Sequence, residues 1–364
     1  GCMNAQVIEL SHAAPGRLAL LGTGTVGTAF VVRYQALQAR GLALPPFRWL
    51  ANSRAVLACD GAPERPLHEI QRAPRLTAAA TAWKQPDSLH AGDVVVDATG
   101  SESVAAEHAG WLARGVHVVT ANKLGLGAQQ QRAAQIAANC ADSGARYGDS
   151  ATVGAGLPLL SSLRALVEGG DRIHRIEGVL SGSLAWLFHR YDGSQPFSVA
   201  VREALAAGFT EPDPRLDLCG EDVRRKLLIL ARACGLAVDD GQVNIDSLVP
   251  AALAALPPEQ ALAQLAQLDE AVQQRWRRAH MAGQVLRFIG SVQPGAARVG
   301  LQSLAADHPL ASGAGTDNRV AIHSDRYRDQ PLLIQGPGAG AEVTAAALLD
   351  DVLRIARTQA TERR

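Results

Sequence analysis

Residues 17–30 read RLALLGTGTVGTAF, a short apolar run followed by a glycine-rich turn and then by apolar residues at helical spacing. A strand, a tight turn and a helix, with glycines spaced as GxGxxG, are typical of a dinucleotide-binding unit. The first glycine permits the turn, the second lets the backbone approach a pyrophosphate, and the third allows close helix packing. The alternative is a glycine turn in an unrelated α/β domain. We expect a dinucleotide to contact Gly22, Thr23, Gly24, Thr25, Val26 and Gly27.

Three further apolar segments, residues 47–51, 94–98 and 116–120, predict strands, and helical stretches separate them. This alternation predicts an α/β fold, namely a Rossmann-type, doubly wound parallel sheet. Ligands of such sheets gather at the carboxyl ends of the strands. We therefore expect Thr99 and Gly100, which follow the strand at 94–98, to contact the cofactor.

The length of the chain predicts two domains, because 364 residues exceed what one hydrophobic core usually serves. After Tyr147 the sequence becomes glycine-rich, and we place the domain crossing near Ala155. Residues 172–180 and 332–335 predict further strands, residues 251–284 predict helices, and a last helix follows Gly340. We expect a nucleotide-binding domain at 1–155, an α+β substrate-binding and catalytic domain at 156–331, and a segment at 332–364 that returns to the first domain.

The composition is that of a globular protein, with 47% apolar residues, 19% charged residues and a formal net charge of zero. This balance does not favour binding to nucleic acid or to a membrane surface, and it does not favour a disordered chain. The five cysteines are scattered and never form CxxC, which fits a reducing cytoplasm. No apolar run reaches the length of a spanning helix, and the start lacks the pattern of a signal peptide. We expect a cytoplasmic protein that acts on a small molecule.

The end of the second predicted strand indicates which nicotinamide cofactor is used. An NAD-specific site places an acidic residue there, to bond the ribose hydroxyls. This chain has Ala51, Asn52, Ser53 and Arg54 instead. An arginine can pair with a 2′-phosphate, so NADP(H) is favoured and NAD(H) stays possible, with Asn52 and Arg54 as candidate contacts. Arg54 could equally be an ordinary surface residue.

Residues 210–215, TEPDPR, form a rigid acidic turn, because each proline pushes its preceding residue toward an extended conformation. A helix follows from Glu221, and on it Asp222 and Lys226 are four residues apart and therefore neighbours. Such a pair is commonly an exposed ion pair of about 0.3–0.5 kcal/mol. However, only three of the 35 basic residues are lysines, Lys84, Lys123 and Lys226, and a simple ion pair would accept arginine. A proton donor would not, since arginine hardly ever deprotonates.

The segment GFTEPDPRLDLCGEDVRRKLLILAR (208–232) resembles the substrate and catalytic motif of homoserine dehydrogenases. The segments GTGTVG, LANSRAVL, VVTANK, TVGAGLPLL, GVLSGSLAWLF and GPGAGAEVTAA also resemble that family's segments, in the family's order. The strongest resemblance is to the dehydrogenase half of fused aspartokinase/homoserine dehydrogenases. The resemblance implies reversible, NAD(P)H-dependent reduction of L-aspartate 4-semialdehyde to L-homoserine, in threonine and methionine biosynthesis. It also implies a homodimer formed through the second domain.

The resemblance assigns roles to individual residues. Lys226 would be the general acid, Asp222 would bind the substrate near its reacting oxygen, and Glu211 and Asp217 would hold the substrate's amino group. Lys123, in the VVTANK segment, would contact cofactor and substrate, and if it meets Lys226 their repulsion would lower both pKa values. Two turns complete the predicted site. Ser181 and Gly182 could cradle the substrate carboxylate or form a plain strand-to-helix turn, and the loop ending at Gly340 would close over the nicotinamide.

Family members also bind a monovalent cation, Na⁺ or K⁺, through carbonyls that here map to Val153, Ala155 and Leu157. The acidic residue usual three positions before the valine is Ser150 in this chain, with Asp149 one position earlier. This departure puts the cation site in doubt. The chain also has Leu216 where the family often has a second aspartate.

Two other functions compete with this interpretation. A semialdehyde dehydrogenase that works through a thioester would need a cysteine activated by a neighbouring base, and none of the five cysteines sits in such a context. A non-catalytic nucleotide-sensing protein would have no use for Glu211, Asp222 and Lys226 together. Few residues flank the predicted domains, so we expect no fused kinase or sensing domain and no inhibition by threonine through this chain.

Overall fold

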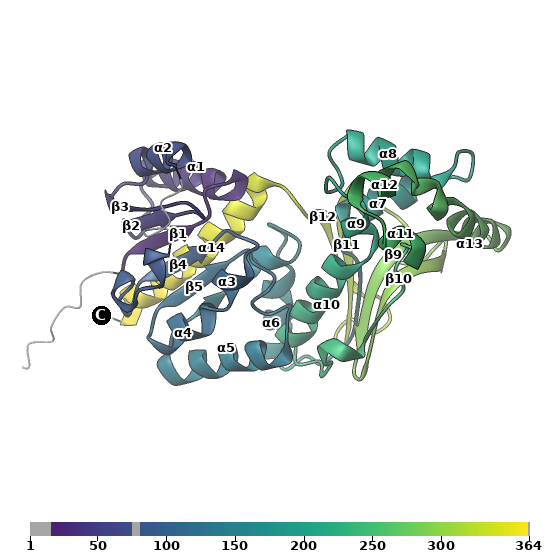
Figure 1. Cartoon of the computed structure of the whole chain (residues 1–364). Helices are drawn as coiled ribbons and strands as arrows, with labels where there is room; N and C mark the ends of the chain where they lie inside the picture. The colour runs from purple at the N-terminus through teal and green to yellow at the C-terminus, as the bar shows by residue number, and fades with distance from the viewer. Residues whose placement is uncertain (1–15, 75–80, 363–364) are drawn as a thin grey trace, which may run out of the picture.

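The computed structural model describes residues 16–74 and 81–362, which form two lobes, each built on a six-stranded sheet (Figure 1). The first sheet has the order β3-β2-β1-β4-β5-β6. Its pairs are parallel except β2 with β3, which run antiparallel at the edge. The strands are β1 (Leu18–Leu21), β2 (Phe47–Ala51), β3 (Val56–Gly61), β4 (Val94–Asp97), β5 (His117–Thr120) and β6 (Tyr147–Gly148).

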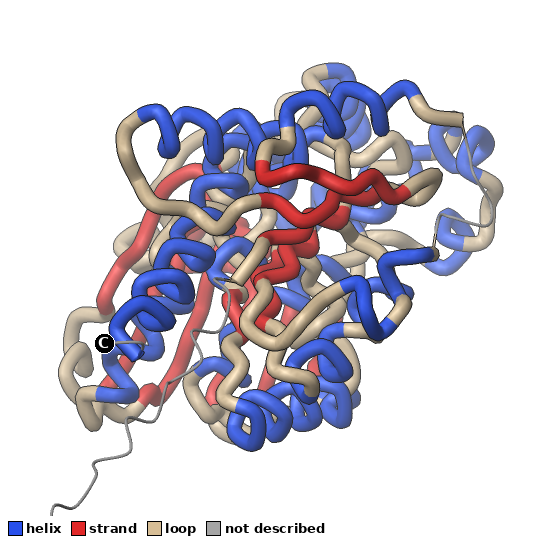
Figure 2. Tube along the Cα trace, turned by 90° about the vertical axis from the view of Figure 1, so that its left-hand side faces the viewer, coloured by secondary structure: helices blue, strands red, loops and turns tan. Residues whose placement is uncertain are grey.

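Helices cover both faces of this sheet, because β1, β4 and β5 are buried along their whole length. Leu18 and Leu20 of β1 pack in one core with the last helix, whereas Ala19 and Leu21 pack in another with Trp111. The turned view shows helices on both sides of these strands (Figure 2). The helices are α1 (Thr25–Ala39), α2 (Glu64–Arg72), α3 (Glu102–Ala105), α4 (His108–Ala113), α5 (Gln130–Ser143) and α14 (Ala341–Glu362), with 3-10 turns η1 (Ala82–Lys84), η2 (Pro86–Ser88) and η3 (Ser150–Thr152). The predicted doubly wound α/β sheet is confirmed, with β3 as its one antiparallel strand among the described residues.

The second sheet has the order β12-β11-β7-β9-β10-β8 and is antiparallel except where β8 pairs with β10. Its strands are β7 (Ile173–Val179), β8 (Val243–Ile245), β9 (Gln284–Gln293), β10 (Ala296–Ala305), β11 (Asp317–Ser324) and β12 (Leu332–Pro337). No element was predicted for residues 285–331, where β10, β11 and nearly all of β9 lie.

The second domain's core joins this sheet to its helices. Leu227 and Leu230 of α10 pack there together with Phe288 of β9, so the predicted apolar face of that helix is confirmed. The helices are α6 (Leu159–Glu168), α7 (Gly182–Arg190), α8 (Phe197–Ala206), α9 (Arg215–Leu218), α10 (Glu221–Ala233), α11 (Ala251–Ala254), α12 (Pro258–Ala263) and α13 (Asp269–Met281), with 3-10 turns η4 (Asp240–Gln242) and η5 (Leu265–Leu268).

The chain crosses between the lobes twice. The first crossing follows β6, since Leu159 of α6 already belongs to the second core. The second crossing comes later than the predicted residue 332: β12 pairs with β11 in the second sheet, and only α14 returns to pack beside α1 (Figure 1). The prediction was wrong for 332–337 because an apolar strand signal does not say which sheet the strand joins. The predicted domain ends at 1–15 and 363–364 lie outside the described residues.

None of the helices within 16–74 and 81–362 combines the length and the apolar character that crossing a bilayer requires.

Candidate active site in the cleft between the domains

The glycine turn of residues 22–27 joins β1 to α1. Gly22 has a φ of 102°, and a Cβ on Gly27 would lie 1.9 Å from the carbonyl oxygen of Gly22. These two glycines are therefore required by the local packing. Gly24 is different, because a Cβ there would meet no described atom within 4 Å. Since no acidic residue and no side-chain cap is found in the described first turn of α1, its backbone amides are left for an anion such as a phosphate.

A cavity of about 540 Å³ adjoins this turn. Asn52 lies in its wall and donates its side-chain amide to the hydroxyl of Thr23 at 3.1 Å. The carboxyl ends of β1, β2 and β4 meet here, which is where a doubly wound sheet binds the adenosine part of a dinucleotide. Of the residues predicted to bind the cofactor, this cavity brings together Gly22, Asn52, Thr99 and Gly100.

The basic residue in the wall of this cavity is Lys84 and not the predicted Arg54. Arg54 does not line the cavity: its guanidinium donates to the carbonyl oxygens of Ile70 and Gln71, at 3.5 and 3.2 Å. Lys84 does line it, with its ammonium group over the ring of Trp83. Sequence reasoning missed Lys84, although the scarcity of lysine that drew attention to Lys226 applies equally to it.

A second cavity, of about 890 Å³, continues from Thr99 and Gly100 into the cleft between the lobes. Both domains contribute to its wall. The first domain supplies the start of α1 and the loop after β5, the second supplies α10, and the segment between β12 and α14 closes it. Among the predicted residues, it brings together Thr25, Val26, Thr99, Gly100, Lys123, Ala155, Asp222, Lys226 and Gly340.

The two lysines meet on one carboxylate. Lys226 Nζ lies 2.8 Å from Asp222 Oδ2, and Lys123 Nζ lies 3.3 Å from Asp222 Oδ1. Lys226 also donates to the carbonyl oxygen of Leu180 at 2.8 Å, and its side chain is only 12% exposed. An ammonium has three donors, so one donor of Lys226 is left for a ligand in the cavity.

The electrostatics fix the charge of Asp222. Burial alone would raise the pKa of Asp222, but the ammonium groups of Lys226 and Lys123 lower it to about 2. Asp222 is therefore ionised at neutral pH. It holds two positive groups side by side where a reacting oxygen could gain negative charge.

The acidic turn before α10 stands next to this pair. Asp217 accepts hydrogen bonds from the Ser183 hydroxyl at 2.8 Å and from the backbone amide of Glu211 at 2.9 Å. Burial raises the pKa of Asp217, and the nearby charges of Glu211 and Asp222 raise it further, against these hydrogen bonds. A cationic group placed between Glu211 and Asp217 would relieve this repulsion. Glu211 and Asp217 do not themselves line the larger cavity.

The Ser181–Gly182 turn caps α7. The Ser181 hydroxyl accepts from the backbone amide of Leu184 at 3.3 Å, as an N-cap does. The turn is also close to Lys226, which bonds to Leu180. The glycine loop after β12 packs tightly as well, since a Cβ on Gly338 would lie 2.1 Å from the Asn318 side chain.

The carbonyls expected to hold a cation follow η3. Gly154 and Ala155 both have positive φ, 74° and 50°, so the chain turns sharply there. The nearby carboxylates are engaged elsewhere: Asp149 pairs with Arg164, and Asp351 accepts from the amide and hydroxyl of Ser150. Neither of these two carboxylates is therefore free to complete a cation site.

Comparison with known proteins identifies the two lobes. The homoserine dehydrogenase family profile matches residues 158–353, and the profile of the homoserine dehydrogenase NAD binding domain matches residues 22–148. A homoserine dehydrogenase from Emericella nidulans is 37% identical over 368 residues, covering 94% of this chain and 98% of that protein.

Fused enzymes match as well. The chloroplastic bifunctional aspartokinase/homoserine dehydrogenase 1 of Zea mays is 43% identical over 265 residues, which are 72% of this chain and 29% of that protein. The chain therefore spans less than a third of the length of such relatives. A hyperthermophilic archaeal homoserine dehydrogenase in complex with NADPH shares the fold, with a TM-score of 0.70, 20% identity and coverage of 95% and 98%. With the profiles spanning both domains, the chain belongs to the homoserine dehydrogenase family.

Proposed function

We propose that the protein interconverts L-aspartate 4-semialdehyde and L-homoserine with a nicotinamide cofactor, in the aspartate pathway of amino-acid biosynthesis. The observation that carries the proposal is the meeting of Lys226 and Lys123 on Asp222, in a cavity continuous with the glycine turn. An aldehyde reductase needs a proton donor and positive charge at the carbonyl oxygen, and this arrangement supplies both.

In the direction of reduction, bound NAD(P)H supplies a hydride to the aldehyde carbon. The aldehyde oxygen then becomes strongly basic, and Lys226 gives it a proton through the donor that Asp222 and Leu180 leave free. In the reverse direction the neutral amine of Lys226 accepts the hydroxyl proton. Asp222 orients both lysines, and Lys123 adds positive charge at the same oxygen.

The substrate's two charged ends have candidate partners on the second domain. Glu211 and Asp217 are assigned to the ammonium group, whose charge would offset their mutual repulsion. The turn at Ser181 and Gly182, at the N-terminus of α7, is assigned to the carboxylate.

NADP(H) is the proposed cofactor, with NAD(H) as the alternative. No acidic residue is found in the described wall of the smaller cavity, and Lys84 is in it. Lys84, rather than Arg54, is therefore our candidate partner of the 2′-phosphate. A homodimer through the second domain and a cytoplasmic location stay predictions. Four free cysteines, Cys59, Cys140, Cys219 and Cys234, fit a reducing compartment.

A monovalent cation at Val153, Ala155 and Leu157 is also a proposal, supported by the sharp turn that the positive φ values give their backbone. No step of the mechanism depends on it. Replacing Na⁺ and K⁺ by a bulky organic cation in the assay, and finding turnover unchanged, would rule out a required cation.

The test is direct. The purified protein is mixed with L-aspartate 4-semialdehyde and NADPH, the absorbance of NADPH is followed, and the assay is repeated with NADH. We expect oxidation with both substrate and cofactor present, and a higher kcat/KM with NADPH. No turnover with either cofactor would refute the proposal and favour a nucleotide-sensing protein.

Cys219 decides between this mechanism and a thioester mechanism. It lies in the wall of the larger cavity, but its thiol contacts the carbonyl oxygen of Leu216 at 3.4 Å. Cys219→Ser should keep turnover within about threefold, whereas a thioester enzyme would lose it by orders of magnitude.

A further inference from the structure

Lys123 is carried by the loop between β5 and α5, residues 121–129, which is anchored to the first domain. Asn122 is 1% exposed, and its side-chain amide donates to Asp97 Oδ2 at 3.0 Å and to the carbonyl oxygen of Ser101 at 2.9 Å. The side-chain oxygen of Asn122 accepts a hydrogen bond from the backbone N–H of Leu124 at 3.1 Å. These bonds fix the start of the loop, just before and after Lys123.

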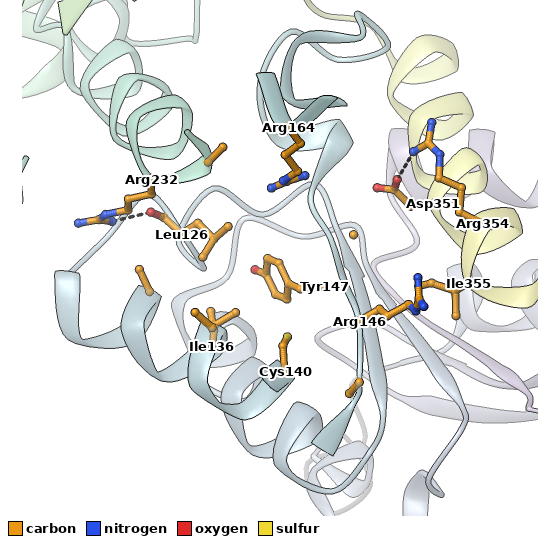
Figure 3. A pocket seen from close by; sticks show the side chains of 15 residues that line it. Leu126, Ile136, Cys140, Arg146, Tyr147, Arg164, Arg232, Asp351, Arg354 and Ile355 are labelled. Atoms are coloured by element: carbon orange, nitrogen blue, oxygen red, sulfur yellow. Dashed lines mark hydrogen bonds and ion pairs between the residues drawn. The ribbon is translucent and has the colours of Figure 1, made fainter. Parts of the chain in front are cut away.

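The far end of the loop is held by the second domain. Arg232 Nη1 donates to the carbonyl oxygens of Leu126 and Ala128, at 2.5 and 2.8 Å. Figure 3 shows the Arg232 side chain reaching to Leu126 beside a pocket that also contains Tyr147. Arg232 belongs to α10, the helix that carries Asp222 and Lys226. One rigid helix thus holds both the carboxylate that Lys123 contacts and the clamp on the loop that carries Lys123.

Packing shows how closely the loop lies on α10. A Cβ on Gly127 would lie 2.5 Å from the carbonyl oxygen of Lys123, 3.0 Å from that of Arg225 and 3.2 Å from Arg225 Cβ. The Gly127 amide also donates to the carbonyl oxygen of Lys123 at 2.7 Å. A displacement of the loop at Gly127 would therefore be passed to the backbone of Lys123.

An arginine buried at the position of Arg232 is unfavourable for the stability of the fold. Burial lowers its pKa, and its Nε and Nη2 are buried without a hydrogen-bond partner among the described residues. Among the described residues, its hydrogen bonds go to the two loop carbonyls and not to a carboxylate. Buried donors without partners destabilise a fold, so a role beyond stability is the better account of this arginine.

We propose that Arg232 is a positioning residue, which docks the 121–129 loop on α10 and so brings Lys123 to Asp222 and Lys226. It does not line the larger cavity, and its effect passes through Lys123. The proposal rests on the proposed function only for its kinetic consequence, because the docking of the loop can be measured without turnover.

The first measurement is hydrogen–deuterium exchange of the peptide that covers residues 121–129, in Arg232→Met and Arg232→Lys. The matched control is Arg202→Met, because Arg202 likewise donates to a backbone carbonyl, that of Leu262 at 2.7 Å, away from the cleft. Arg232→Met should speed exchange at Gly127 about tenfold or more, Arg232→Lys less, and Arg202→Met not at all. Exchange unchanged in Arg232→Met would overturn the proposal, even if the wild-type protein had no dehydrogenase activity.

The second measurement is a kinetic cycle with Lys123→Met. Arg232→Met should lower kcat by about 10–100-fold, since a displacement of roughly 1 Å costs this much, while the Kd for NADPH changes less than threefold. In the Lys123→Met background the same substitution should have little further effect, because its target is already missing. Losses that multiply in the double variant would contradict an action through Lys123 and leave Arg232 a purely structural residue.

Discussion

At the scale of single residues, the main feature is the carboxylate of Asp222 between two lysines. The chain uses arginine nearly everywhere, yet lysine stands at both positions. The structure adds that Lys226 is nearly enclosed, with a carboxylate and a carbonyl fixing its direction. An arginine could form the ion pair but could not deliver a proton at neutral pH.

Lys226 variants test this directly. Lys226→Arg should keep the ion pair with Asp222 and the melting temperature within about 2 °C, yet lose at least about 10³-fold in kcat, because guanidinium is a poor acid. Lys226→Ala should be equally inactive, with nearly wild-type binding of NADPH measured by fluorescence. Turnover within tenfold of wild type in either variant would exclude Lys226 as the proton donor.

His189 gives a separate pH effect on stability. Burial, together with the charge of Arg287, lowers the pKa of His189 to about 4. Between pH 6.5 and about pH 4, His189 is protonated in the unfolded chain but stays neutral in the folded chain. The free energy of unfolding therefore falls as the pH decreases through this range. Above pH 6.5 the histidine contributes nothing.

The expected loss is about 2 kcal/mol between pH 6.5 and pH 4, at roughly 1.4 kcal/mol per pKa unit and with some exposure of the ring. His189→Gln should flatten this part of the profile, measured by urea unfolding at several pH values. An equally steep profile in the variant would assign the acid sensitivity to other groups.

At the scale of elements, the strand–turn–helix unit at the start of the chain separates two uses of glycine. Gly27 serves packing, since its hydrogen faces the carbonyl of Gly22. Gly24 is not required by packing, since the space around its Cβ position is open and its φ of −78° suits any residue, and we predict that it serves the ligand. The glycines of one motif thus differ in their physical surroundings.

Two alanine variants should show the difference. Gly24→Ala should leave the melting temperature nearly unchanged while weakening NADPH binding by at least about tenfold, because a methyl group would stand where the pyrophosphate approaches. Gly27→Ala should lower both. Calorimetry and a binding titration on the two proteins suffice, and a destabilised Gly24→Ala protein would contradict the assignment of that space to the ligand.

At the scale of the whole molecule, a buried ion pair joins the two domains where the chain crosses between them after β6. Asp149 follows the last strand of the first sheet and has a fully buried side chain, while Arg164 belongs to α6 of the second domain. Two bonds of 2.6 Å join the guanidinium to the carboxylate. The pair therefore links the two domains where the chain crosses between them.

Removing one partner of this ion pair should lower the free energy of unfolding far more than removing both. Arg164→Met leaves Asp149 buried and uncompensated, so we expect a loss of about 3 kcal/mol, at the low end of the usual range because Arg164 is 37% exposed. The double variant Asp149→Asn with Arg164→Met should recover much of this loss. Denaturant unfolding of the wild type, the two single variants and the double variant gives the comparison. Losses of unfolding free energy that simply add would show that the charges are not coupled.

The sequence alone determined the local chemistry of this protein. Strand, glycine turn and helix follow from periodicity and from the conformations open to glycine and proline, and Asp222 and Lys226 share a helix face because they are four residues apart. Segments that resemble the homoserine dehydrogenase family pointed to the family, and the reaction is proposed from them. Each of these signals lies within one short stretch of chain.

Only the tertiary structure decided which distant residues meet. That Lys123 reaches Asp222, that Lys84 rather than Arg54 lines the smaller cavity, and that β12 joins the second sheet depend on strand order and on packing between the domains. A strand or a loop has the same local pattern whichever neighbour it finds. Its partner is set by the burial of both surfaces together, which no single segment of the sequence specifies.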